Sequence, residues 1–200
     1  MSRKVYMPTE YAHPWRRYAV LGDSVAEEPG GFAELVRDEL APEAFVNLGR
    51  RNLRAAEVRD LQLSAALAFR PDLAMVVCGA NDAMRPGYEA RADAVDEVMA
   101  GIIRPLQEAG ACVITVSVFV MPQYPLMPAW LGAGFSHRMA LLARHTNTLA
   151  ARLGTIHVDL SEHPAIAAGE ALTGKDGLHG NAHSHRIAAT AVLQRLSALV

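Results

Sequence analysis

Four short groups of polar residues in this sequence combine the residue types that acyl transfer at a serine requires. They are Gly22-Asp23-Ser24, Asn47-Leu48-Gly49, Gly79-Ala80-Asn81-Asp82 and Asp176-Gly177-Leu178-His179. A serine hydroxyl can attack an acyl carbon when a histidine removes its proton and an aspartate orients that histidine. A glycine amide and an asparagine side chain can donate hydrogen bonds to the oxyanion that forms. The set therefore favours nucleophilic catalysis, provided that the fold brings the groups together.

The hydrophobic pattern predicts the scaffold that must position these groups. Short apolar runs near residues 18–21, 44–48, 73–78, 112–118 and 156–160 are predicted strands. Segments of helical period at 31–40, 58–69, 136–153, from about 89 onwards and from beyond 179 to 199 are predicted helices. Such alternation is typical of βαβ units around a parallel sheet. We therefore expect one α/β domain, a three-layer α/β/α sandwich.

Each polar group lies where a parallel sheet binds its ligands, beyond the carboxyl ends of the strands. Ser24, Gly49 and Asn81 follow the first three predicted strands, and His179 follows the fifth, just before the last helix. We expect all four groups at one edge of the sheet.

The predicted helix that Pro71 terminates has apolar residues at helical spacing. They are Val58, Leu61, Ala65, Ala68 and Phe69. We expect this face to lie against the core.

The four groups, in this order and after these elements, resemble the conserved blocks of the SGNH (GDSL-like) serine hydrolase family. Gly-Asp-Ser alone is a weak signal, but all four in order are a strong one, and the resemblance spans roughly residues 18–187. It implies Ser24 as nucleophile, His179 and Asp176 as the other triad members, and oxyanion donors from Ser24, Gly49 and Asn81. It also implies a flavodoxin-like, five-stranded parallel sheet in the order 2-1-3-4-5, without metal or organic cofactor.

Two regions suggest substrate-binding residues. Arg50 and Arg51 follow Gly49, where the family usually has small residues; they are either solvated side chains or a site for an anionic group on the substrate. Residues 119–135 contain three prolines and no period, so we expect an irregular loop there. Tyr124, Met127 and Trp130 in this loop either cover the core or line an acyl pocket.

Other interpretations are compatible with the same residues. Ser24 taken alone could be only a helix N-cap. His185, inside the final helix, is expected to be a structural or surface histidine. Gly180 follows His179 where relatives often have proline. An acyltransferase with a non-water acceptor would use the same triad as an esterase that cleaves an ester or thioester. A catalytically silent binding protein of the same fold is the alternative from another class, although it should show a broken motif.

Composition argues against several classes of partner and indicates where in the cell we expect the protein. With 19 basic and 21 acidic residues, the net charge of -2 gives no case for nucleic acid or an anionic membrane surface. No segment has the apolar length of a membrane helix, and the N-terminus has no secretory apolar region, so we expect a cytoplasmic protein. We expect a small-molecule, lipid or glycoside acyl ester as substrate. The predicted organisation is an N-terminal extension at 1–17 and a hydrolase domain at 18–200.

Overall fold

The five predicted strands form one parallel sheet. The computed structural model describes residues 15–124, 126 and 129–199, and for residues 129–133 it describes the backbone only. The strands are β1 (Arg17–Gly22), β2 (Ala44–Asn47), β3 (Leu73–Val77), β4 (Cys112–Ser117) and β5 (Ile156–Asp159). All neighbouring strands are parallel, in the order β2-β1-β3-β4-β5. The predicted strand order is confirmed.

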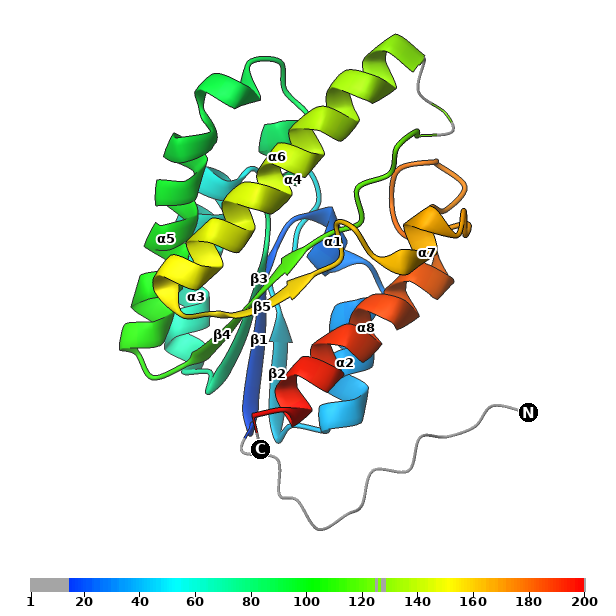
Figure 1. The fold of residues 1–200 in the computed structure, drawn as a ribbon. Helices are drawn as coiled ribbons and strands as arrows, with labels where there is room; N and C mark the ends of the chain where they lie inside the picture. Colours follow the sequence, from blue (N-terminus) through cyan, green and yellow to red (C-terminus); the bar gives the residue numbers. More distant parts are fainter. Residues whose placement is uncertain (1–14, 125, 127–128, 200) are drawn as a thin grey trace, which may run out of the picture.

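Helices cover both faces of the sheet and complete the predicted three-layer sandwich (Figure 1). One face carries α2 (Phe32–Leu40) and α8 (Ala182–Ser197), and the other carries α3 (Ala55–Phe69), α5 (Ala92–Glu108) and α6 (Ala129–Leu153). The short helices are α1 (Ser24–Glu27), α4 (Ala80–Ala83) and α7 (Pro164–Ala167), with a 3₁₀ turn η1 (Tyr88–Ala90). Among the described helices, none combines the length and apolar character that crossing a membrane requires.

The central strand β3 divides its side chains between the two helical layers. Ala74 and Val76 join the apolar cluster beneath α3, α5 and α6. Leu73, Met75 and Val77 join the cluster beneath α2 and α8. This alternation follows from the two-residue period of a strand, and it explains why a strand covered on both faces is a continuous apolar run.

Helix α6 begins earlier than the sequence predicts. The expected irregular region extends to residue 135, whereas α6 starts at Ala129, directly after the last of the three prolines. Gly132 and Gly134 lower the intrinsic helix propensity of this first part, which is why the sequence pattern does not reveal it.

The predicted apolar face of α3 is wrong. Val58 is buried, but Leu61 is 60% exposed. The core face instead carries Ala55, Val58, Gln62 and Ala66. A polar Gln62 faces the core because both ends of its amide are hydrogen-bonded to the backbone of β1, which removes the usual cost of burying an amide.

The N-terminal boundary shifts slightly. Residues 1–14 of the predicted extension lie outside the described residues, and Arg17, which was assigned to the extension, already belongs to β1.

Candidate active site

A tight turn between β1 and α1 carries Ser24. Gly22 ends β1 in close contact with β3. A side chain has no room at this position, since a Cβ atom would lie 2.1 Å from the Val77 carbonyl oxygen. Gln62 of α3 binds both backbone groups of Gly22: its Oε1 accepts from the N–H and its Nε2 donates to the carbonyl, each at 2.8 Å. These contacts fix the end of β1, so that Ser24 begins α1 at the carboxyl edge of the sheet.

Asp23 is the N-cap residue of α1. Its Oδ1 accepts a hydrogen bond from the Val25 amide at 3.1 Å, which satisfies a backbone donor at the start of the helix. The residue is 1% exposed, and its Oδ2 is buried with no hydrogen-bond partner among the described residues. Burial raises the pKa of Asp23 to about 7. Asp23 therefore holds the turn that carries Ser24.

Ser24, His179 and Asp176 form a continuous hydrogen-bonded chain. His179 Nε2 lies 3.0 Å from Ser24 Oγ, and His179 Nδ1 lies 2.6 Å from Asp176 Oδ2. The hydrogen bond from His179, and next the one from the Leu178 amide, lower the pKa of Asp176 to about 2. Because an ionised Asp176 accepts the Nδ1 hydrogen, Nε2 is left to accept the proton of the Ser24 hydroxyl.

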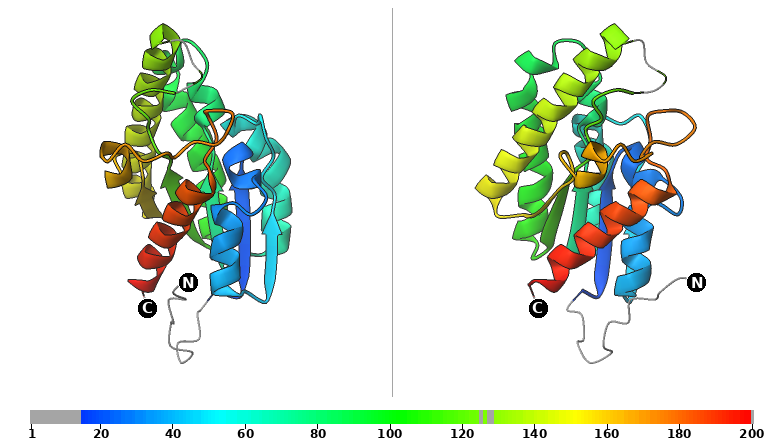
Figure 2. Two further views of the ribbon diagram at one scale, coloured as in Figure 1. Left: turned by 90° about the vertical axis from the view of Figure 1, so that its right-hand side faces the viewer. Right: turned by 45° about the vertical axis from the view of Figure 1, so that its right-hand side comes forward.

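The loop that carries Asp176 and His179 is held by its own backbone. The Gly174 amide donates to the His179 carbonyl at 2.8 Å. Asn181 caps α8 by accepting from the amides of His183 and Ser184. In Figure 2 the segment between α7 and α8 reaches over to α1 at the carboxyl end of the sheet, which is how residues 155 positions apart meet.

Asn81 is fixed beside the nucleophile by the segment that leads into α3. Its Nδ2 donates to the Leu53 carbonyl at 2.9 Å, and the neighbouring Asp82 Oδ2 accepts from the Ala55 amide at 2.9 Å. One amide hydrogen of Asn81 is thus occupied, and no acceptor among the described residues binds the second. Asp82 therefore satisfies a backbone donor in the first turn of α3.

The Gly49 amide is differently placed from what the resemblance implies. It donates to Asn47 Oδ1 at 2.9 Å, while Asn47 Nδ2 donates to the Ala26 carbonyl at 2.7 Å. Gly49 is also absent from the lining of the cavity described next. Its N–H would have to leave Asn47 before it could reach an oxyanion.

A largely apolar cavity of about 180 Å³ adjoins Ser24 and His179. It lies beyond the end of β4, where its lining includes Val116, Val118 and Phe119. One part of the lining comes from Tyr124, Phe135 and Met139, and another from Phe32, Leu160, Leu172, His185 and Ala188. An apolar pocket that opens beside a serine and a histidine is suited to hold an acyl group.

The predicted substrate-binding residues have different outcomes. Tyr124 lines the cavity and packs its ring 4.6 Å from that of Phe135, centroid to centroid. Met127 lies outside the described residues, and only the backbone of Trp130 is described, within α6. Arg50 does not line the cavity.

The neighbouring arginine is engaged elsewhere. Arg51 Nε lies 2.7 Å from Glu27 Oε2 in an ion pair at the end of α1.

Several cavity residues escaped the sequence argument. Phe32, Asn52, Met84, Leu172 and His185 line it without belonging to any of the four polar groups. Asn52 carries one local signal in the structure, a positive φ of 67°, which asparagine tolerates better than most residues. Phe32 and His185 come from segments far apart in the chain, and no local pattern could connect them.

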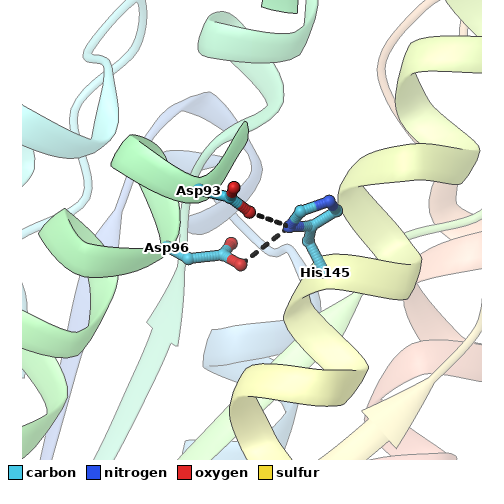
Figure 3. Close-up of side chains that lie close together, drawn as sticks. All are labelled: Asp93, Asp96 and His145. Atoms are coloured by element: carbon cyan, nitrogen blue, oxygen red, sulfur yellow. Dashed lines mark hydrogen bonds and ion pairs between the residues drawn. The ribbon is translucent and has the colours of Figure 1, made fainter. Parts of the chain in front are cut away.

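Among the described residues, one group has the spacing of metal ligands. Asp93, Asp96 and His145 place one ligand atom each within 4.8 Å of one another (Figure 3). His145 Nδ1 is already 2.7 Å from Asp96 Oδ2, and Asp93 is fully exposed. The group joins α5 to α6, none of its members lines the cavity, and the chemistry of Ser24 does not involve it.

Comparison with solved structures finds the same fold in several proteins. The crystal structure of TesA has a TM-score of 0.72 and 20% sequence identity, covering 92% of this chain and 99% of that one. Axe2, an acetylxylan esterase from Geobacillus stearothermophilus, has a TM-score of 0.72 and 16% identity, covering 90% and 94%. LAE5, an alpha/beta hydrolase enzyme from the metagenome of Lake Arreo, Spain, has a TM-score of 0.73 and 15% identity, covering 92% and 96%.

Sequence comparison supplies the family. No curated protein sequence matches this chain significantly. The GDSL-like Lipase/Acylhydrolase family matches over residues 20–187, a span that contains the turn of Ser24 and the loop of Asp176 and His179. The chain belongs to the GDSL-like lipase/acylhydrolase family and is an ester-hydrolysing enzyme.

Proposed function

We propose that this enzyme hydrolyses carboxylic esters or thioesters through an acyl-serine intermediate formed on Ser24. The observation that carries the proposal is the hydrogen-bonded chain from Ser24 Oγ through His179 to Asp176, at 3.0 and 2.6 Å. An unbroken chain of this kind also argues against a catalytically silent binding protein, which has no need for it.

Acylation begins when Ser24 Oγ attacks the acyl carbon and its proton passes to His179 Nε2. The ionised Asp176 stabilises the resulting imidazolium. Asn81 and the Ser24 amide donate hydrogen bonds to the oxyanion, and removal of one such donor typically costs about 2.7–4 kcal/mol of transition-state stabilisation. The intermediate then collapses: the bond to the leaving group breaks, and His179 returns the proton to the departing oxygen or sulfur.

Deacylation repeats these steps with water as the nucleophile. His179 takes a proton from the water, the hydroxyl attacks the acyl carbon, and Ser24 leaves with the returned proton. The side chains of His179 and Asp176 are 35% and 53% exposed, so water reaches the acyl-enzyme. An exposed base favours hydrolysis over transfer to an alcohol or amine, for which a covered site is better suited.

The cavity limits the size of the acyl group. Its volume of about 180 Å³ is close to the ~150 Å³ of an engineered apolar cavity that binds benzene. We therefore propose acyl groups of up to about six carbon atoms or a small aromatic ring. This size favours short-chain esters of small alcohols or sugars over long-chain lipids.

The test is p-nitrophenyl ester hydrolysis across acyl lengths from acetyl to palmitoyl, with wild type, Ser24→Ala and the exposed control Ser197→Ala. We expect a nitrophenol burst and turnover in wild type and the control, an optimum at short acyl chains, and a loss of kcat of about 10⁶-fold in Ser24→Ala. Unchanged turnover in Ser24→Ala would overturn the nucleophile. A palmitoyl optimum would contradict the acyl size, and new esters formed from added alcohols at the expense of hydrolysis would favour acyl transfer.

A further inference from the structure

His185, on the first turn of α8, is a buried histidine that the proposed reaction does not use. It is 9% exposed and lines the acyl cavity. Its Nδ1 accepts a hydrogen bond from the Phe32 amide at 3.2 Å. The two rings are stacked, with an interplanar angle of 11° and centroids 6.2 Å apart. His185 is therefore bound to the first residue of α2, and both residues line the cavity that adjoins Ser24.

The same ring contacts the loop that carries the catalytic base. A Cβ atom placed on Gly180, which directly follows His179, would lie 3.3 Å from His185 Nε2 and 2.7 Å from Ser184 Oγ. A Cβ atom placed on Gly31 would lie 3.4 Å from His185 Cε1. Glycine at both positions lets the imidazole fill the gap between the two segments, so the ring spaces the start of α2 from the His179 loop.

The hydrogen bond from Phe32 determines the tautomer of this histidine. Since Nδ1 accepts from an amide, it carries no hydrogen, and the neutral ring holds its single hydrogen on Nε2. That Nε2 is buried and has no hydrogen-bond partner among the described residues. Unsatisfied buried donors are rare in folded proteins, and an apolar ring at this position would avoid that cost.

We propose that His185 is a positioning residue, whose neutral ring holds the His179 loop at its working distance from Ser24. This inference rests on the proposed function, because it assigns His185 a role in that same reaction. The ring acts through His179 and the backbone of Gly180, and it takes no proton from the substrate. Small displacements matter here, since a misplacement of about 1 Å in an active site can lower the rate about 10²-fold.

Protonation of His185 would break the contact. A hydrogen on Nδ1 would face the Phe32 N–H, and two donors cannot bond to each other. Burial lowers the pKa of His185 and a protonated His179 lowers it further, whereas Glu28, from the segment before α2, acts in the opposite direction. The active form therefore needs two neutral histidines, His179 as base and His185 as spacer.

The first test is the acid limb of kcat/KM for a short p-nitrophenyl ester, followed while circular dichroism confirms the fold. We expect the logarithm of kcat/KM to fall with a slope that steepens from one towards two in wild type, because two groups must be neutral. In His185→Phe the slope should remain one, since phenylalanine cannot be protonated.

The second test compares kcat and KM in His185→Phe and His185→Asn with a packing control. His185→Phe keeps a ring but leaves the Phe32 amide without an acceptor, whereas His185→Asn keeps an acceptor but removes the spacer. We expect each to lower kcat at least tenfold, with KM changed less than twofold. Val192→Ala, fully buried on the same helix, should lower the melting temperature and leave kcat within twofold.

Several outcomes would overturn the role of His185. One is a wild-type acid limb that keeps a slope of one for as long as the protein stays folded; this measurement needs no variant. Another is a loss of kcat in the His185 variants no larger than in Val192→Ala at the same loss of melting temperature. Failure of the proposed function is separate: a wild type without a Ser24-dependent burst refutes that function, whereas a normal burst with insensitive His185 variants refutes only the positioning role.

Discussion

Two aspartates of the proposed active site lie in contrasting environments. Asp23 precedes the serine in sequence, is 1% exposed and keeps one carboxylate oxygen without a partner among the described residues. Asp176 reaches the serine through His179, has a side chain that is 53% exposed, and accepts three hydrogen bonds. Burial raises the pKa of Asp23 to about 7, while hydrogen bonds lower that of Asp176 to about 2.

The difference shows why closeness in sequence does not decide which carboxylate serves catalysis. A carboxylate that stabilises an imidazolium must be ionised when the reaction occurs, and Asp176 meets that condition at any pH well above 2. Burial disfavours the ionised form of Asp23, and its Oδ1 already accepts a hydrogen bond from the Val25 amide. Two carboxyl groups with separated pKa values commonly have separate roles. In the proposed reaction, Asp176 orients the base, and Asp23 holds the turn that carries the nucleophile.

The largest effect is expected when Asp176, the partner of His179, is replaced. Asp176→Asn should lower kcat about 10⁴-fold with little change of fold, because the amide no longer accepts the Nδ1 hydrogen and favours the wrong tautomer of His179. Asp23→Asn is the matched control, with the same change of atoms, and should keep kcat within about tenfold of wild type. Steady-state hydrolysis of a short p-nitrophenyl ester measures both. Equal losses in the two variants would erase the proposed division of roles.

The second-largest effect should be the contribution of the buried Asp23 to the pH dependence of the free energy of unfolding. Because the pKa of Asp23 is higher in the folded state than the ordinary value of 3.8, the folded protein binds more protons between these values. Stability from this group is therefore complete below about pH 4 and is lost as the pH rises through about 7.

In Asp23→Asn this loss should be absent. Relative to the variant, wild type should lose up to about 4 kcal/mol of unfolding free energy between pH 4 and pH 7. Urea unfolding at several pH values measures the difference. A difference that stays constant with pH would mean that Asp23 is ionised at no cost in the fold.

Much of the fold could be predicted from the sequence, but only part of the site. The four polar groups fall after strands whose order is confirmed, because apolar runs and helical periods fix a parallel sheet and its carboxyl edge. The residues that support the turn of Ser24 were harder to predict. Gln62 is a polar residue on the core face of α3, where it binds the backbone of Gly22. A hydrophobic pattern assigns polar residues to the exposed face, so it does not predict this contact with the turn that carries Ser24.

Other features depend on contacts between distant segments. His185 meets Phe32 across 153 positions, and the Gly49 amide is taken by Asn47, which sequence spacing alone could not show. The early start of α6 at Ala129 was hidden by two glycines in its first turns. Sequence thus indicates where the reactive groups gather, whereas the partners that orient and space them come from side-chain packing.

The smallest expected effect is the contribution of Asp176 to acid stability, and its sign is opposite to that of Asp23. Because the folded pKa of Asp176 lies below 3.8, at about 2, its contribution is complete above about pH 4 and is lost as the pH falls through about 2. The side chain is half exposed, so solvent screening limits this contribution to less than about 1 kcal/mol. Urea midpoints between pH 5 and pH 2 should fall slightly more steeply for wild type than for Asp176→Asn. Equal slopes in the two proteins would mean that the hydrogen bonds of the triad loop form only when substrate is bound.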